Sequence, residues 1–325
     1  MTKSMMPGLR CYRAPLSGFT TSGAIDSTEC VIVRRFVVAR LDVSSQWDPL
    51  FSTRSPMFRT LDGFRPWYRT FVSEWPTLGD YQSLLAQQES PVMTRNGLPL
   101  RIVPQADKPG RFEQHYAPRI YLSGEIQTRT ENWHDFFQLL TWIMFPRTKA
   151  MINETHIPLA QARIESGVEL GRRSALENML SLFDEGGALI ISSDKKLLQM
   201  VRDFQWKPLF WQQRETLQEK LTCMVFGHAM YEKGLAPYIG MTANTILLHC
   251  GDDFFQLSNS QQLAWVDDAL LAALSDRKQL SVPKDLSPFP VLGMPGWDAD
   301  NGNESYYDNR HYFRPGRGGK MQKTG

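Results

Sequence analysis

Residues 132–149 read NWHDFFQLLTWIMFPRTK, and this stretch decides the fold. Between positions 136 and 145 almost every side chain is apolar, so a helix formed here has no polar face. A helix that is apolar all round is buried by the rest of its protein. The sequence therefore predicts a buried central helix near 132–146.

The two ends of this helix carry their own signals. Asn132 is a good N-cap residue, and Asp135, three positions later, suits both a capping box and the positive end of the helix dipole. Pro146 lacks a backbone donor. We therefore expect it to kink or end the helix.

Around the central helix the pattern predicts more helices than strands. Short helices and loops are expected over 47–85, and longer helices over 157–183 (with a new capping box at Ser174 and Glu177), 215–233 and 261–274. Short strands are expected over 98–103, 119–125, 188–192 and 245–248. From Ser281 on, prolines and aromatic residues predict an ordered wrap without regular structure. Helices and strands do not alternate as in a Rossmann fold, so the predicted class is α+β, mainly helical, with a small sheet.

Composition and charge distribution predict one globular domain with basic ends. The chain has 325 residues, 42% of them hydrophobic, which is enough for a sizeable core. A net charge of +2 excludes a strongly basic nucleic-acid binder for the chain as a whole. The ends are basic and the body between them is acidic. We expect a flexible basic segment over 1–45, a single domain over 46–313 and a disordered basic tail over 314–325.

The cysteines and the lack of long apolar runs favour a cytoplasmic protein. The four cysteines form no Cys-x-x-Cys pair, which is typical of free thiols in a reducing compartment. No run approaches the roughly 18 uncharged apolar residues of a membrane span. We therefore expect no membrane partner, and contact with nucleic acid only through the basic termini.

Several segments together resemble one protein family. They are Asn132–Asp135, Phe145–Lys149, Leu182–Glu185, Phe226–Ala229 with Glu232 and Lys233, Leu292–Trp297, Tyr307 with Asp308, and Phe313–Pro315. This set resembles the bacterial domain-of-unknown-function family 3025, over roughly residues 47–314. The resemblance implies a cytoplasmic bacterial protein and supplies no established activity. Two positions depart from the family pattern: Gln138, where Asn is expected, which argues against a direct role for that side chain, and Gly186, where Asn is common.

The pair His134-Asp135 opens the most buried helix and is the first candidate site. Its functional interpretation is a pair of metal ligands, or a general base with an orienting carboxylate. Helix capping accounts well for Asp135 and poorly for His134. His156 is an unsuitable partner, because an unbroken helix would place it about 33 Å from His134. Only a sharp turn after Pro146 would bring it back.

Two further acid and histidine groups complete the candidate set. Asp184 and Glu185 follow a helix and precede a buried strand, where active-site acids often lie, although a solvated turn is the favoured explanation for these two acids taken alone. His228 and Glu232 are spaced i,i+4 and share a helix face, either as half of a site or as a surface pair. Gly227, next to the histidine, would let another chain or a ligand approach closely.

Arg147 and Lys149 follow the central helix, where cations satisfy the helix dipole or clamp a phosphate or carboxylate. Motifs of nucleotide-triphosphate motors, Rossmann enzymes, serine hydrolases and zincins are missing.

The leading hypothesis is a hydrolase-like, metal-dependent enzyme acting on a small anionic or phosphate-containing substrate. The metal would be zinc, manganese or iron. Its expected ligands are His134, Asp135, Asp184 and His228. Glu185 or Glu232 would be the base and Arg147 the anion clamp. Two other classes stay open: a non-catalytic binding or scaffold protein, and a factor that associates with RNA or the ribosome through its basic ends.

Overall fold

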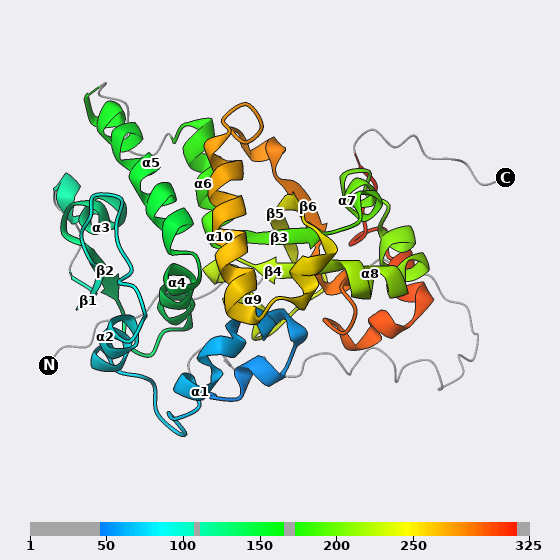
Figure 1. Cartoon of the computed structure of the whole chain (residues 1–325), viewed down its shortest axis with the longest axis horizontal. Coiled ribbons are helices and arrows are strands. Elements are labelled where there is room, and N and C mark those ends of the chain that lie inside the picture. Colours follow the sequence, from blue (N-terminus) through cyan, green and yellow to red (C-terminus); the bar gives the residue numbers. More distant parts are fainter. Residues whose placement is uncertain (1–45, 107–110, 166–172, 317–325) are drawn as a thin grey trace, which may run out of the picture. The chain divides into compact units, whose positions relative to one another are not determined.

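The structure is a computed structural model that describes residues 46–106, 111–165 and 173–316 (Figure 1). The N-terminal segment expected to be flexible and the tail from residue 317 lie outside the described residues. The described part is mainly helical with two small sheets, so the predicted α+β class is confirmed. No helix within the described ranges has both the length and the apolar character needed to cross a bilayer.

The helices of the described chain are α1 (Arg65–Tyr68), α2 (Leu78–Ala86), α3 (Tyr116–Ser123), α4 (Trp133–Met144), α5 (Pro146–Glu165), α6 (Ala175–Gly186), α7 (Lys195–Arg202), α8 (Arg214–Lys220), α9 (His228–Gly234) and α10 (Asn259–Ser275). The strands are β1 (Arg101–Pro104), β2 (Glu125–Thr128), β3 (Gly187–Ser192), β4 (Leu221–Val225), β5 (Thr242–His249) and β6 (Ser287–Pro290).

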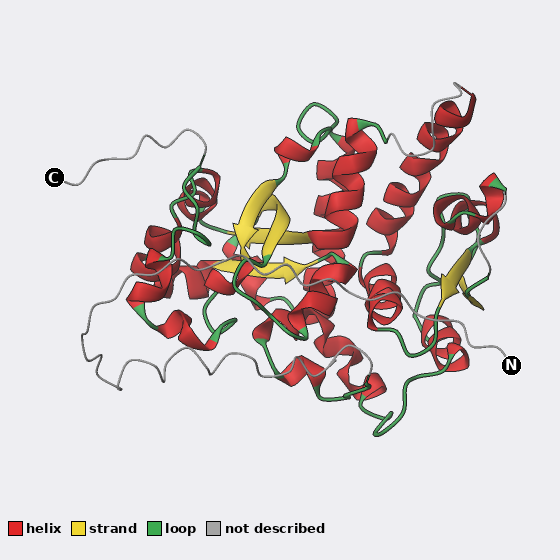
Figure 2. Ribbon diagram, turned by 180° about the vertical axis from the view of Figure 1, so that it is seen from behind, coloured by secondary structure: helices red, strands yellow, loops and turns green. Residues whose placement is uncertain are grey.

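Strand β3 is an inner strand of the larger sheet, whose order is β4-β3-β5-β6. Figure 2 shows the strands in yellow, with helices packed around them. It pairs antiparallel with β4 and parallel with β5, and β5 pairs antiparallel with β6. All six residues of β3 are buried, which explains its continuous apolar run. The second sheet is a parallel pair of β1 and β2.

The predicted buried helix is α4. Every residue from 133 to 144 is buried except His134 and Ile143. The Asn132 side chain accepts a hydrogen bond from the backbone N–H of Asp135 at 3.0 Å, so the predicted N-cap is confirmed. The helix ends before Pro146, which is the first residue of α5, where a missing N–H costs nothing.

Helix α6 begins where its capping signal predicted. The Ser174 hydroxyl accepts from the Glu177 N–H, and the Glu177 carboxylate accepts from the Ser174 N–H. The helix continues to Gly186, so Asp184 and Glu185 lie in its last turn. The predicted turn at these two acids is therefore wrong.

Three other expectations about secondary structure are also wrong. The strand expected over 119–125 is helix α3, which ends at Gly124 in the left-handed conformation before β2 begins. The single helix expected over 215–233 is broken into α8, β4 and α9. The segment after Ser281 contains strand β6. The physical reason is the same for the last two: β4 and β6 form because β3 and β5 offer them strand partners, which no local pattern reveals.

Candidate functional site

A cavity of about 550 Å³ lies among helices α3, α4, α5 and α6. This volume is in the range of small-molecule sites. Each of three helices turns one face toward it, with residues spaced three or four apart. They are His134, Gln138 and Trp142 of α4, Lys149, Asn153 and His156 of α5, and Glu177, Ser181, Asp184 and Glu185 of α6.

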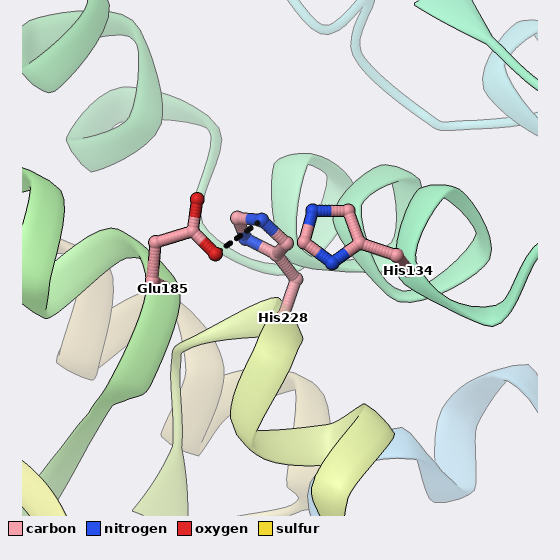
Figure 3. Close-up of side chains that lie close together, drawn as sticks. All are labelled: His134, Glu185 and His228. Carbon is pink, nitrogen blue, oxygen red and sulfur yellow. Dashed lines mark ion pairs between the residues drawn. The ribbon is translucent and has the colours of Figure 1, made fainter. Parts of the chain in front are cut away.

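One wall of the cavity brings together His134, Glu185 and His228 (Figure 3). They come from α4, the last turn of α6 and the first residue of α9. One possible ligand atom from each lies within 4.8 Å of the other two. The two imidazole rings are 4.4 Å apart between centroids and nearly perpendicular. Two predicted metal ligands and a predicted base therefore converge, while Asp135 and Asp184 are not part of this group.

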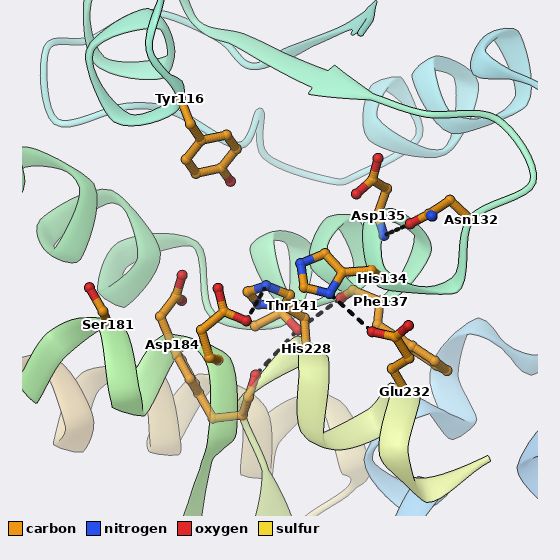
Figure 4. A network of polar contacts seen from close by, with 12 residues as sticks. Tyr116, Asn132, His134, Asp135, Phe137, Thr141, Ser181, Asp184, His228 and Glu232 are labelled. Carbon is orange, nitrogen blue, oxygen red and sulfur yellow. Dashed lines mark hydrogen bonds and ion pairs between the residues drawn. The ribbon is translucent and has the colours of Figure 1, made fainter. Parts of the chain in front are cut away.

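Gly227 makes the convergence of α6 and α9 possible. A Cβ atom at this position would lie 2.4 Å from the backbone carbonyl oxygen of Glu185. The chain just before it is also tied to α4, since the Thr141 hydroxyl donates to the carbonyl of Phe226 at 3.3 Å (Figure 4). The close approach predicted at this glycine is confirmed, and the approaching chain is the end of α6.

His134 is oriented by Glu232. Its Nδ1 lies 3.1 Å from Oε2 of Glu232, one turn into α9 (Figure 4). This hydrogen bond raises the pKa of His134 against the opposing effect of burial. With its Nδ1–H donated to the carboxylate, the imidazole keeps a lone pair on Nε2. His228 and Glu232 share a face, as predicted, and both contact the same histidine.

His228 is the most buried member of the group. Only 1% of its side chain is exposed, and neither ring nitrogen has a hydrogen-bond partner among the described residues. Its closest charged neighbour is Oε2 of Glu185, 3.4 Å from Nε2. Burial lowers the pKa of His228 to about 3, so its ring is neutral at physiological pH. Burial also raises the pKa of Glu185, and the charge of His134 partly opposes this effect.

The two remaining predicted ligands are already paired. The Lys149 ammonium contacts Oδ1 of Asp184 at 2.5 Å and lies 5.4 Å from the centroid of the Trp142 ring. Burial, the largest single effect, raises the pKa of Asp184, but the charge and hydrogen bond of Lys149 together with the nearby histidines His228 and His156 outweigh it, so the pKa is lowered. Asp135 accepts two hydrogen bonds from the Arg129 guanidinium, at 2.8 and 3.0 Å.

Arg147, the predicted anion clamp, does not line this cavity. Its exposed guanidinium pairs with Asp268 of α10, and its backbone N–H donates to Asp267. His156 does line the cavity, although the sequence predicted that it would lie too far from His134. The reason is the sharp turn between α4 and α5: α5 begins at Pro146 and runs in a different direction from α4, so that one of its faces lines the cavity (Figure 1).

Several cavity residues carry no signal in the sequence analysis. The hydroxyl of Tyr116, at the start of α3, accepts from the Trp142 indole at 3.4 Å, and Figure 4 shows it directed toward the acidic end of α6. Arg129 and Arg173 bring positive charge from two loops. Gln138, in contrast, was named in the sequence but expected to have no direct role, although it lies one helical turn from His134 and so shares its face.

The comparisons with known proteins give one match. A family model described as a protein of unknown function (DUF3025) matches residues 100–317, which include every residue of the site. No curated protein and no solved structure matches the chain.

Proposed function

The chain belongs to the DUF3025 family, whose function is unknown, and from its cavity we propose a metal-dependent hydrolase of small anionic molecules. The observation that carries the proposal is the convergence of His134, Glu185 and His228 from three separate helices. Two histidines and one carboxylate form the kind of nitrogen and oxygen ligand set that suits zinc, manganese or iron.

The spacing of Glu185 and His228 supports a shared ion rather than a direct bond. Two ligands of one tetrahedral ion, each about 2.1 Å from the metal, lie about 3.4 Å apart. The contact between Nε2 of His228 and Oε2 of Glu185 has this length and does not satisfy hydrogen-bond geometry. A neutral, buried imidazole without a hydrogen-bond partner is costly unless something binds it.

His134 would supply the third ligand through Nε2. Metal-binding histidines usually donate their other ring N–H to a carboxylate, which fixes the tautomer and the ring orientation. Glu232 occupies this position at Nδ1 of His134. We therefore assign Glu232 a positioning role, in place of the base expected from the sequence.

Three protein ligands leave a coordination position for water. A bound divalent ion would lower the pKa of that water toward about 7 and supply the nucleophile for hydrolysis. In such a hydrolysis the water oxygen would replace the leaving group at the acyl or phosphoryl centre, the bond between that centre and the leaving group would break, and a proton of the water would pass to the leaving group. The chain itself would bind and orient the substrate in the cavity.

Arg173 is the cation best placed to receive an anionic substrate. Lys149 and Arg129 are held by Asp184 and Asp135. The exposed Arg173 guanidinium instead donates to the Ser181 hydroxyl at 3.0 Å, at the same cavity. An arginine that keeps free donors suits a phosphate or carboxylate. Arg173 thus takes the role first expected for Arg147.

Metal binding by the full-length protein tests the proposal first. Metal-free protein is titrated with Zn²⁺ and with Mn²⁺ by calorimetry, and we expect one ion per chain. Glu185→Gln is expected to weaken binding at least tenfold, whereas Glu219→Gln on the exposed face of α8 should not. If neither ion binds, the proposal is wrong.

Hydrolysis is tested separately with the loaded protein. We expect metal-dependent cleavage of p-nitrophenyl phosphate or p-nitrophenyl acetate that is lost in Glu185→Gln and retained in Glu219→Gln. A protein that binds the ion but cleaves neither ester would be a metal-dependent binding protein instead. If the His134 and Glu185 variants lower stability without any effect of metal, the polar pairs serve only to join the helices.

A further inference from the structure

Gln138 is a buried amide that the proposed chemistry does not use. It lies on α4 one turn after His134 and one turn before Trp142, about 6 Å along the helix axis from each. Only 8% of the residue is exposed, and it lines the same cavity.

The amide of Gln138 has no protein partner in the described part of the chain. Neither its oxygen nor its nitrogen makes a hydrogen bond there, and neither is sealed from solvent. Because Gln138 lines the cavity, its amide keeps unused hydrogen-bonding capacity there. The amide of Gln138 therefore offers a donor and an acceptor between His134, at the proposed metal site, and the Trp142 ring.

Asn153 shows the contrast with an amide used for structure. Its nitrogen donates to the carbonyl of Ala117 at 2.9 Å, so the side chain joins α5 to α3. Its oxygen is sealed from solvent and out of reach of a bound molecule. Of these two amides, only that of Gln138 is available to a ligand.

A glutamine amide has an acceptor oxygen beside a donor nitrogen, and this pair determines which ligand group it binds best. An anion would accept from Nε2 but leave Oε1 facing another acceptor, and a cation would do the reverse. A neutral amide, with one N–H and one C=O, satisfies both atoms. A buried polar group left unpaired costs more than a formed hydrogen bond gains, so such a site discriminates strongly.

We propose that Gln138 determines the specificity of this cavity and that the substrate carries an amide group. The inference rests on the proposed function and names its substrate class, a small anionic amide. The amide would bond Gln138, an aromatic or apolar part would face Trp142 and Tyr116, and the negative group would contact Arg173. This proposal gives Gln138 a direct role, contrary to the expectation from the sequence.

Two probes that differ in one atom test this directly. Hippurate has a phenyl ring, an amide and a carboxylate, and O-benzoylglycolate replaces the amide N–H with an ester oxygen. Their affinities are measured by ligand-observed NMR on metal-free full-length protein, so that neither probe is hydrolysed. We expect hippurate to bind about 5–100-fold more tightly, because the ester oxygen leaves Oε1 of Gln138 facing another acceptor, which costs more than the loss of one net hydrogen bond.

The variant Gln138→Met keeps the length of the side chain and removes its hydrogen-bonding atoms. It is expected to abolish the preference, while Gln218→Met on the exposed face of α8 preserves it. The side-chain NH₂ signal of Gln138, identified by its loss in the variant, should shift when hippurate is added.

The outcomes separate this inference from the proposed function. A wild-type protein that binds both probes equally, or neither, overturns the role of Gln138, even if it binds one metal ion. A preference that survives in Gln138→Met also overturns it. A preference that Gln138→Met abolishes supports the inference even if titration finds no metal.

Discussion

Nε2 of His228 lies 3.4 Å from Oε2 of Glu185, although the two residues belong to different helices. The contact depends on Gly227, whose neighbours leave no room for a side chain, and on the last turn of α6. It joins the most buried histidine of the site to a half-exposed carboxylate. The geometry of the proposed metal site is therefore set by how closely two helix ends approach.

Replacing Gly227 with alanine should separate these helix ends. The added methyl group would meet the carbonyl of Glu185 at 2.4 Å, so we expect a loss of about 1–3 kcal/mol in unfolding free energy. Affinity for Zn²⁺ should fall with it. Urea denaturation and calorimetry measure the two effects. Gly302→Ala is the control, because nothing lies within 4 Å of the place that its added methyl group would take. Equal behaviour of the two variants would contradict the prediction.

Glu232 should increase the affinity for Zn²⁺ by holding His134, a proposed metal ligand, in its orientation. Glu232→Ala removes the acceptor for Nδ1 and should weaken Zn²⁺ binding about 10–100-fold. Glu232→Gln keeps an acceptor oxygen and should restore most of the affinity. Since Glu232 is 39% exposed, circular dichroism is expected to show an intact fold in both variants. Equal affinities for the alanine and glutamine variants would rule out the positioning role.

Replacing Lys149 alone should lower the unfolding free energy more than replacing both Lys149 and Asp184. Lys149→Met leaves the Asp184 charge without its partner and should lower the unfolding free energy by about 3 kcal/mol. In the double variant Lys149→Met/Asp184→Asn, no uncompensated charge remains, and stability should recover. Urea denaturation of the wild type, the single variants Lys149→Met and Asp184→Asn, and the double variant gives the coupling energy. Additive losses would show that the two residues act independently.

His156 should make the protein less stable in mild acid. Burial lowers its pKa in the folded state, against the charges of Asp184 and Glu177, which act to raise it. Between the folded value and the unfolded value of about 6.5, the unfolded chain binds the extra proton. Stability should therefore fall as the pH drops below about 6.5.

The variant His156→Gln isolates this effect. We expect its loss of unfolding free energy between pH 7.5 and pH 5.5 to be smaller than that of the wild-type protein. His249→Gln, at an exposed position at the end of β5, should behave like the wild type. A steeper pH dependence in His156→Gln would show that the sign of the shift is wrong.

The sequence was most informative where the structure depends on neighbouring residues in the chain. The caps at Asn132 and Ser174 bond the N–H groups three residues ahead, so their motifs identify both helix starts. The apolar run of β3 identifies a strand buried on both faces. In contrast, the sequence pattern predicts a helix where β4 forms, because the pairing of β4 with β3 involves residues more than 25 positions away in the chain.

The candidate site could be predicted as a set of residues but not as an arrangement. His134, Glu185, His228 and Glu232 were all identified from the sequence, and the structure brings them together. The roles of Arg147 and Lys149 could not be separated, because both follow the same helix end. Lys149 faces the cavity, whereas Arg147 faces Asp268 on α10.

The sequence by itself determined the buried central helix, because a helix without a polar face can only be stable inside the protein. It also determined the capped start of α6 and the side-chain chemistry available to a site. Only the tertiary structure decided which of those side chains meet. The pairing of β3 with β4 and the close approach at Gly227 help to place His134, Glu185 and His228 on one wall, and the turn between α4 and α5 adds His156 to the cavity. These are contacts between distant segments, and their energy depends on partners that no local sequence pattern contains.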